Sequence, residues 1–183
     1  MIAVLVMLAT ADESALRAAF EKAKDVAPKL EALKKLAGAK EEKSIEVLAK
    51  ALKDPEKDVR KTAAETLETA EDVQGRAIKP LGELMNDKKE EPELRLAAAK
   101  ALGKAHFKAE PLEAFFQCIG GITNQDRTLF KFGADVTAVL NKFAGEDFGM
   151  GKQTASLWEQ WWTDNKEKIR QEDARKRAAL KKD

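Results

Sequence analysis

The sequence predicts an all-α solenoid, in which antiparallel helical hairpins stack in a row. The first supporting observation is composition, because the 183 residues are rich in the helix formers Ala, Leu, Lys and Glu and include only 5 Pro. The second is that long runs of β-branched residues, which favour strands, are missing. The third is that two apolar patterns at helical spacing each recur about every 34 residues, as they do in repeat architectures.

The N-terminal residues 1–11 are apolar and end in Ala9-Thr10-Ala11, directly before the polar Asp12. About ten apolar residues are too few to span a bilayer, which takes about 20. They match the hydrophobic region and cleavage site of a secretory signal peptide, although the usual basic region is missing. We therefore expect a signal-peptide remnant and a secreted or periplasmic protein. The alternative is an apolar helix that packs on the first repeat of a cytoplasmic protein.

Residues 12–27 are expected to form an N-terminal helix, because Asp12 or Ser14 can cap its first turn. A second helix should start at Pro28, whose missing N–H does no harm in a first turn, and should end at Gly38. The repeats are expected from this second helix onward.

A third helix, over residues 44–53, carries Ile45, Leu48 and Leu52 at positions i, i+3 and i+7 of one face. The same spacing recurs in two later segments, at Ile78, Leu81 and Met85 and at Leu112, Phe115 and Ile119. These three segments are predicted to be equivalent helices of successive repeats, and we name them the B helices.

A second pattern precedes two of the B helices. After the turn at Asp54-Pro55, the residues Val59, Ala63 and Leu67 share one helical face. This pattern recurs at Leu94, Ala98 and Leu102 and, more loosely, at Phe132, Val136 and Leu140. One hairpin cannot bury its own apolar face, so these A helices and the B helices are expected to stack and to share a continuous core.

The segment DPEKDVR at residues 54–60, followed by Ala63-Ala64 and Leu67, resembles the turn and A helix of the HEAT-repeat family. The segment PELR, followed by three alanines and then Leu-Gly, resembles them again at residues 92–103. The likeness is in particular to short bacterial repeats, also called phycobilisome-lyase-like. It covers residues 28–145 and implies a HEAT-like α-α superhelix. We take the nickname as a statement about fold and not about function.

The resemblance also implies a role for two arginines. In the HEAT family the arginine after the turn pairs with acidic groups of adjacent repeats. Arg60 and Arg95 would carry this structural role here, near Asp54, Asp58 or Asp87.

Residues 146–169 are expected to form a glycine-rich loop and a Trp-rich capping helix. Ala155, Trp158 and Trp162 fall at i, i+3 and i+7, and Trp161 lies beside them. This segment resembles the closing segment that follows bacterial HEAT arrays, and it would cover the open end of the core. The alternative is that one tryptophan, Trp161, is exposed and contributes to a partner surface.

Residues 170–183 are expected to form a charged C-terminal tail. The last eighteen residues, 166–183, contain 8 Lys and Arg but only 4 Asp and Glu. Few of them are apolar, so the sequence predicts a protruding helix that buries little and frays.

Enzyme chemistry finds no support in the sequence. The only histidine, His106, excludes a His-rich metal site, and we interpret it as a turn or helix-end residue. The only cysteine, Cys118, has no basic residue within four positions, so we interpret it as a partly buried structural thiol. No phosphate-binding glycine motif occurs. We expect no catalysis, no cofactor and no metal; loss of a measured activity on changing His106 or Cys118 would revive an enzyme.

In HEAT-like arrays the B helices line the concave side, so the resemblance directs the candidate site to their polar positions. We expect a non-catalytic scaffold that binds a protein or peptide there. Both signs of charge alternate along this face, which suits protein contacts better than a ligand of one charge. The candidate partner-binding residues are Glu46, Lys50, Lys53, Lys79, Glu83, Asn86, Glu113 and Gln117.

The alternative function is binding of nucleic acid or another anionic surface through the basic tail together with Lys50, Lys53 and Lys79. The formal net charge is only +1, and Glu167, Glu172, Asp173 and Asp183 interrupt the tail. These acidic residues disfavour nucleic acid as the partner. No integral membrane span is expected.

Overall fold

The computed structural model describes residues 12–72, 74–120, 127–149 and 154–181. These residues form nine helices. In chain order they are α1 (Glu13–Lys22), α2 (Val26–Lys35), α3 (Glu42–Ala51), α4 (Lys57–Leu67), α5 (Ile78–Asn86), α6 (Pro92–Leu102), α7 (Ala109–Gly120), α8 (Arg127–Ala144) and α9 (Thr154–Leu180). The signal-peptide prediction concerns residues 1–11, which lie outside the described ones. Of the helices described, none is both long and apolar enough to cross a bilayer.

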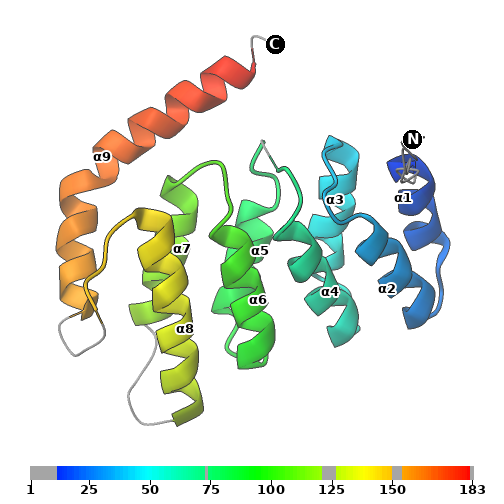
Figure 1. The fold of residues 1–183 in the computed structure, drawn as a ribbon, viewed down its shortest axis with the longest axis horizontal. Coiled ribbons are helices and arrows are strands. Elements are labelled where there is room, and N and C mark those ends of the chain that lie inside the picture. Colours follow the sequence, from blue (N-terminus) through cyan, green and yellow to red (C-terminus); the bar gives the residue numbers. More distant parts are fainter. Residues whose placement is uncertain (1–11, 73, 121–126, 150–153, 182–183) are drawn as a thin grey trace, which may run out of the picture.

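The helices lie in two rows, and the predicted all-α solenoid is thereby confirmed (Figure 1). In one row α2, α4, α6 and α8 pack on one another in chain order. The other row contains α1, α3, α5, α7 and α9. The rows contact each other through α1 and α2, α3 and α4, α5 and α6, and α7 and α8. The predicted A helices α4, α6 and α8 therefore form one side of the array, and the B helices α3, α5 and α7 the other.

The predicted apolar stripes form the core between the rows. All nine residues of the A stripes are buried, and so are the B-stripe residues except Ile119, which is half-buried. Small residues allow the B helices to approach closely: a Cβ added to Gly82 on α5 would lie 3.2 Å from the Cβ of Ala114 on α7. Burial of these stripes is the main favourable term that holds the hairpins together.

The first two helices test the predicted boundaries. Asp12 caps α1, because its Oδ1 accepts a hydrogen bond from the Ser14 backbone N at 3.0 Å. The predicted start of the second helix at Pro28 is wrong by two residues, since α2 begins at Val26. Pro28 is tolerated because the first four N–H groups of a helix have no partner within it. Gly38 follows α2 with a φ of 76°, a conformation that glycine adopts at low cost.

Arg60 joins two consecutive repeats. Its Nη1 donates to the backbone oxygens of Asp54 and Pro55, both at 2.8 Å. Its Nη2 donates to Oε2 of Glu90 at 2.9 Å, and its Nε lies 2.8 Å from Oε1 of the same carboxylate. Glu90 precedes α6, so the arginine links the turn before α4 to the next turn of the array. The carboxylate partner is therefore not one of the three aspartates that we expected.

Arg95 joins repeats without a carboxylate partner among the described residues. Its side chain is buried, and its Nε donates to the backbone oxygen of Met85 at the end of α5, at 2.8 Å. Its guanidinium lies 4.3 Å from the ring centroid of Phe132 on α8. A carbonyl and an aromatic face thus take the place of the predicted acidic group, and both interactions favour a cation.

The aromatic residues of α9 pack against the end of the array. Trp158 is fully buried, and its ring lies edge-on to Phe148 with centroids 4.7 Å apart. Trp161 and Trp162 are half-buried. Because α9 packs on α7, the first half of α9 continues the row of B helices.

The C-terminal segment is helical, as predicted, but it also makes contacts with the array that were not predicted. A single helix of 27 residues, α9, runs through the Trp-rich segment and on to Leu180. In its second half Ile169 and Asp173 are buried. Figure 1 shows this half crossing the array above the loop between α6 and α7.

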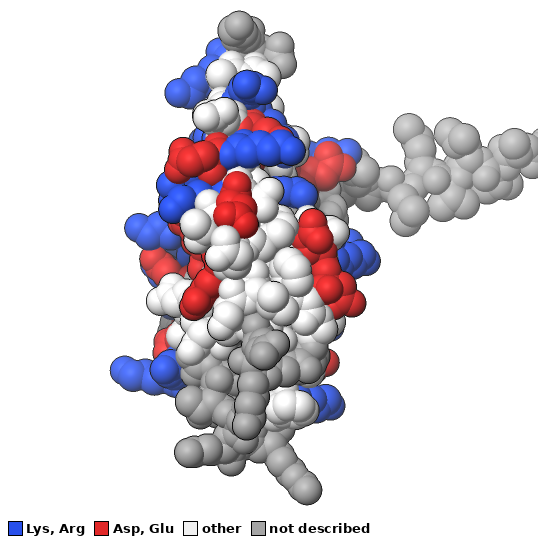
Figure 2. Space-filling model, turned by 90° about the vertical axis from the view of Figure 1, so that its left-hand side faces the viewer, with Lys and Arg blue, Asp and Glu red and all other residues white. Residues whose placement is uncertain are grey.

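The end of the array that α8 and α9 form carries little charge in its middle. Figure 2 shows acidic and basic side chains around an uncharged centre on this face. Phe130 on α8 and Leu157 on α9 are 54% and 44% exposed. This end therefore differs from the polar outer face that terminal repeats generally carry.

Candidate functional site

The candidate residues lie on the exposed surface of α3, α5 and α7, which we name the B face. Seven of the eight side chains are exposed, and Asn86 is half-buried. The candidates on α3 and directly after it are Glu46, Lys50 and Lys53; those on α5 are Lys79, Glu83 and Asn86; those on α7 are Glu113 and Gln117.

A groove between α5 and α7, which we name the α5–α7 groove, brings five of these residues together. Its volume is about 410 Å³. Ile78, Gly82 and Ala114 contribute apolar lining. The candidates that line it are Lys79, Glu83, Asn86, Glu113 and Gln117, and Glu110, which was not predicted, joins them. The three candidates from the α3 segment do not line this groove.

Asn86 has a structural task inside the groove. Its Nδ2 donates to the backbone oxygen of Gly82, at 3.0 Å, and to that of Ala114 on α7, at 3.1 Å. Both amide hydrogens are thereby used within the protein. Asn86 joins α5 to α7 and leaves only its amide oxygen for a partner.

Ion pairs between neighbouring helices occupy several charges of the B face. Lys53 Nζ lies 2.9 Å from Glu83 Oε2, and this hydrogen bond from Lys53 lowers the pKa of Glu83 below its ordinary value. Glu46 pairs with Arg76 at 2.9 Å. Within the described residues, Lys50 and Lys79 have no carboxylate within 4.0 Å, so they remain available to a partner.

The distal half of α9, residues 167–180, supplies arginines to the same face. Arg170 Nη2 lies 2.8 Å from Glu113 Oε1, and Arg177 Nη2 lies 3.0 Å from Glu110 Oε1. Both carboxylates line the α5–α7 groove, so α9 borders it. This contact was not predicted from the sequence, although Arg170 and Arg177 are seven residues apart, at a spacing that places them on one face of a helix.

Comparison with known proteins identifies the repeat type. A family model described as HEAT repeats matches residues 13–103. Residues 13–103 are therefore similar to HEAT repeats. This HEAT segment contains α1 to α6, so it begins before the predicted first repeat at Pro28 and includes the helix that we set apart at the N-terminus. No curated protein matches the chain.

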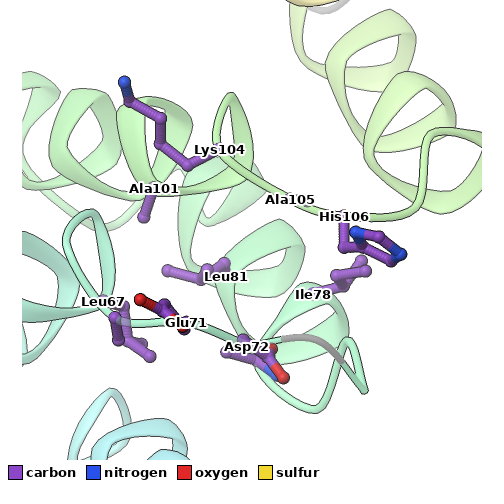
Figure 3. Close-up of a pocket in the computed structure, with 11 residues that line it drawn as sticks. Leu67, Glu71, Asp72, Ile78, Leu81, Ala101, Lys104, Ala105 and His106 are labelled. Carbon is purple, nitrogen blue, oxygen red and sulfur yellow. The ribbon is translucent and has the colours of Figure 1, made fainter. Parts of the chain in front are cut away.

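A second pocket lies at the edge of the helical array, between the α4–α5 segment and the end of α6 (Figure 3). Its volume is about 240 Å³, and Leu67, Ile78 and Leu81 give it an apolar lining. Asp72 and His106 also line it. His106 is exposed in the α6–α7 loop, in agreement with its interpretation as a turn residue.

Asp72 is committed to backbone hydrogen bonds at this pocket. Its Oδ1 accepts from Arg76 N at 2.9 Å, and its Oδ2 accepts from Ala77 N at 2.8 Å. These bonds satisfy donors directly before α5. Asp72 is therefore engaged in a structural role at this pocket.

Cys118 on α7 is a buried free thiol. Burial raises the pKa of Cys118, and the nearby Arg95 opposes this shift only in part. The Sγ lies 3.8 Å from Arg95 Nη2. A protonated and covered thiol is unsuited to nucleophilic attack. The described residues also contain no group of three or more His, Cys, Asp or Glu that could hold a metal ion.

Proposed function

We propose that this chain is a non-catalytic scaffold that binds a protein or peptide on its B face, with the α5–α7 groove as the centre of the contact. The observation that carries the proposal is the convergence of five candidate side chains on this one groove. HEAT arrays favour this use because stacked repeats form extended binding surfaces.

The chemistry of the groove favours a partner with both charges and some apolar surface. Lys79 and Gln117 offer a cation and an amide, and Glu83 adds a carboxylate that also pairs with Lys53. Ile78 and Ala114 provide apolar surface between them. A protein segment can form ion pairs, hydrogen bonds and apolar contacts with all of these groups at once, whereas a polyanion would be repelled by the carboxylates.

The experiment is a pull-down from the native host with three versions of the chain. The first is the wild type, and the second carries Lys50→Glu, Lys79→Glu and Glu83→Lys on the B face. The third is a matched control on the opposite side of the array, with Lys61→Glu, Lys100→Glu and Glu65→Lys. Both variants change the net charge equally, so general charge effects cancel.

We expect a partner that the wild type and the control retain and the B-face variant loses. Retention by both variants would place the contact elsewhere and overturn the proposal. Failure of all three versions to retain any protein would also count against it.

The nucleic-acid alternative is weakened by the position of α9. Arg170 and Arg177, which the alternative would need, pair with Glu113 and Glu110. Salt-sensitive retention of the chain on DNA at low ionic strength would favour the alternative, since phosphate contacts release counterions. No retention at low salt would exclude it.

We also propose that residues 1–11 direct export and are removed after Ala11. The support is the apolar run and the Ala9-Thr10-Ala11 pattern before Asp12. N-terminal sequencing of the protein from the cell envelope should begin at Asp12. A start at Met1 in the cytoplasmic fraction would contradict export.

A further inference from the structure

The distal half of α9 supplies the cap of another helix. Asp173 is 6% exposed, and its Oδ2 accepts hydrogen bonds from the backbone N atoms of Lys108, at 2.8 Å, and Ala109, at 2.7 Å. Ala109 is the first residue of α7. A carboxylate at a helix N-terminus satisfies free N–H groups and interacts favourably with the helix dipole. In most helices this cap comes from the preceding residue, but here it comes from α9.

Positively charged side chains hold the two sides of this cap. Three residues before Asp173, Arg170 pairs with Glu113. Four residues after it, Arg177 pairs with Glu110, and its guanidinium lies 3.9 Å from the ring centroid of Phe107. Arg170, Asp173 and Arg177 lie at i, i+3 and i+7, so the cap and both ion pairs come from one face of α9.

Lys176 adds one more polar contact by donating to the backbone oxygen of His106 at 3.0 Å. Apolar contacts contribute less, because in the distal half only Ile169 is a buried hydrophobic residue, and Leu180 is half-buried. The side chains of Arg170 and Arg177 are 50% and 41% exposed. An interface with exposed ion pairs is screened by salt and is held weakly.

We propose that residues 167–180 are a detachable strap that occupies a helix-docking site on α7. The site consists of the free N–H groups at the start of α7, the carboxylates of Glu110 and Glu113, and the ring of Phe107. It fits a helix that carries an acidic residue with arginines three positions before and four positions after it. A partner helix with this pattern would compete with the strap.

The strap would regulate the B face. Glu110 and Glu113 line the α5–α7 groove, so release of the strap exposes two carboxylates there. Only this regulation of the B face rests on the proposed function, because the docking site itself is defined by its contacts with α9. A bound partner and the strap would exclude each other, and occupation in cis would lower the apparent affinity for the partner.

The test uses the full chain and a fluorescently labelled synthetic peptide of residues 166–180, with binding measured by fluorescence anisotropy. Three versions of the chain are compared: the wild type, Asp173→Ala and the matched control Glu172→Ala. Glu172 lies on the same helix, is exposed and makes no ion pair within the described residues, so its loss changes the charge equally without affecting the cap.

We expect the Asp173→Ala chain to bind the peptide about tenfold more tightly than the wild type or the control, because its own strap competes less. A peptide with Asp173→Ala should not bind. Adding Glu110→Lys and Glu113→Lys to the Asp173→Ala chain should abolish binding of the normal peptide. A second variant, Arg170→Ala with Arg177→Ala, keeps the cap and should also bind the peptide more tightly than the wild type, which guards against misfolding of the first.

Equal peptide binding by the wild type and both loosened variants would overturn the strap, as would binding that survives the Glu110 and Glu113 reversals. The assay requires no protein partner. A positive peptide result with a negative pull-down would refute the proposed function and leave the strap in place. The reverse result would refute the strap alone.

Discussion

Asp173 and Ala109 are separated by 64 positions in the chain, yet the Asp173 carboxylate accepts a hydrogen bond of 2.7 Å from the Ala109 backbone N. This bond connects the last helix to the start of α7. It makes the C-terminal segment part of the folded array, where the sequence predicted a protruding helix. The stability of α7 should therefore depend on a residue near the C-terminus.

The first prediction concerns this cap. Asp173→Ala should lower the free energy of unfolding by about 1 to 2 kcal/mol, because it removes the cap and leaves the N–H groups of Lys108 and Ala109 without their acceptor. Chemical denaturation followed by circular dichroism measures the change. Glu172→Ala is the control and should change stability by less than about 0.5 kcal/mol. Equal losses for the two variants would show that the hydrogen bonds contribute nothing specific.

The second prediction concerns the link between repeats at Arg60. Arg60→Ala should lower the free energy of unfolding by about 2 kcal/mol, since it leaves Glu90 and two backbone oxygens without their donor in a mostly buried setting. Arg60→Lys should recover less than half, because an ammonium group cannot form the forked contact. Thermal and chemical unfolding of the two variants test this order.

The control for Arg60 is Arg76→Ala. Arg76 also pairs with carboxylates of another element, Glu42 and Glu46, but its side chain is 39% exposed and theirs are 52% and 53% exposed. Arg76→Ala should lower the free energy of unfolding by less than about 1 kcal/mol. A larger effect for Arg76 than for Arg60 would contradict the role of burial in this prediction.

The third prediction concerns acid. Burial alone would raise the pKa of Asp54, but hydrogen bonds from Lys29 and from the Glu56 backbone N lower it below the ordinary value of 3.8. The folded state therefore binds this proton less tightly than the unfolded state. The ionised Asp54 carboxylate therefore stabilises the fold fully above pH 3.8. This stabilisation is lost as the pH falls through the lower pKa of Asp54 in the folded state.

Asp54→Asn should consequently destabilise the protein at pH 7, and the difference from the wild type should shrink at pH values below 3.8. Denaturant titrations at several pH values measure it. Asp58→Asn, at an exposed carboxylate in the first turn of α4, should show a smaller difference at pH 7. A difference for Asp54→Asn that stays constant down to strongly acidic pH would argue against the ionised pair with Lys29.

The sequence predicted the solenoid well because its signal is local and repeated. Each stripe, such as Val59, Ala63 and Leu67, lies on one face of its own helix. An apolar helix face is stable only when it is buried in a core. The recurrence of the stripe then indicates the stacking of helices. Boundaries were less certain, as Pro28 shows, because several positions of a first turn tolerate proline.

The candidate groove was predicted in part. Helical spacing places Lys79, Glu83 and Glu113 on exposed faces, and the close approach of α5 and α7 brings them together. The use of Asn86 within the protein could not be predicted, because its acceptors are backbone oxygens, one of them on another helix. The candidates on α3 do not join the groove, and only the packing of helices reveals this.

The contacts of charged residues were the least predictable. The partner of Arg60 is Glu90, although several acidic residues lie in the neighbouring turns. The acceptor for the start of α7 is Asp173, and nothing in the residues before α7 indicates a cap from so far away. Charged side chains are long and exposed in most conformations, so their partners depend on the final geometry and not on periodicity.

The last prediction concerns Cys118. Burial both covers the thiol and raises its pKa, so little thiolate is present at pH 8 and a reagent reaches it only when the structure opens. Alkylation in the native protein should be slower than in denaturant, by on the order of 100-fold. The matched control is the double variant Gln117→Cys, Cys118→Ala, which moves the single thiol to the exposed neighbouring position. It should react at nearly the denatured rate, and equal native rates for the two proteins would contradict the buried position of Cys118.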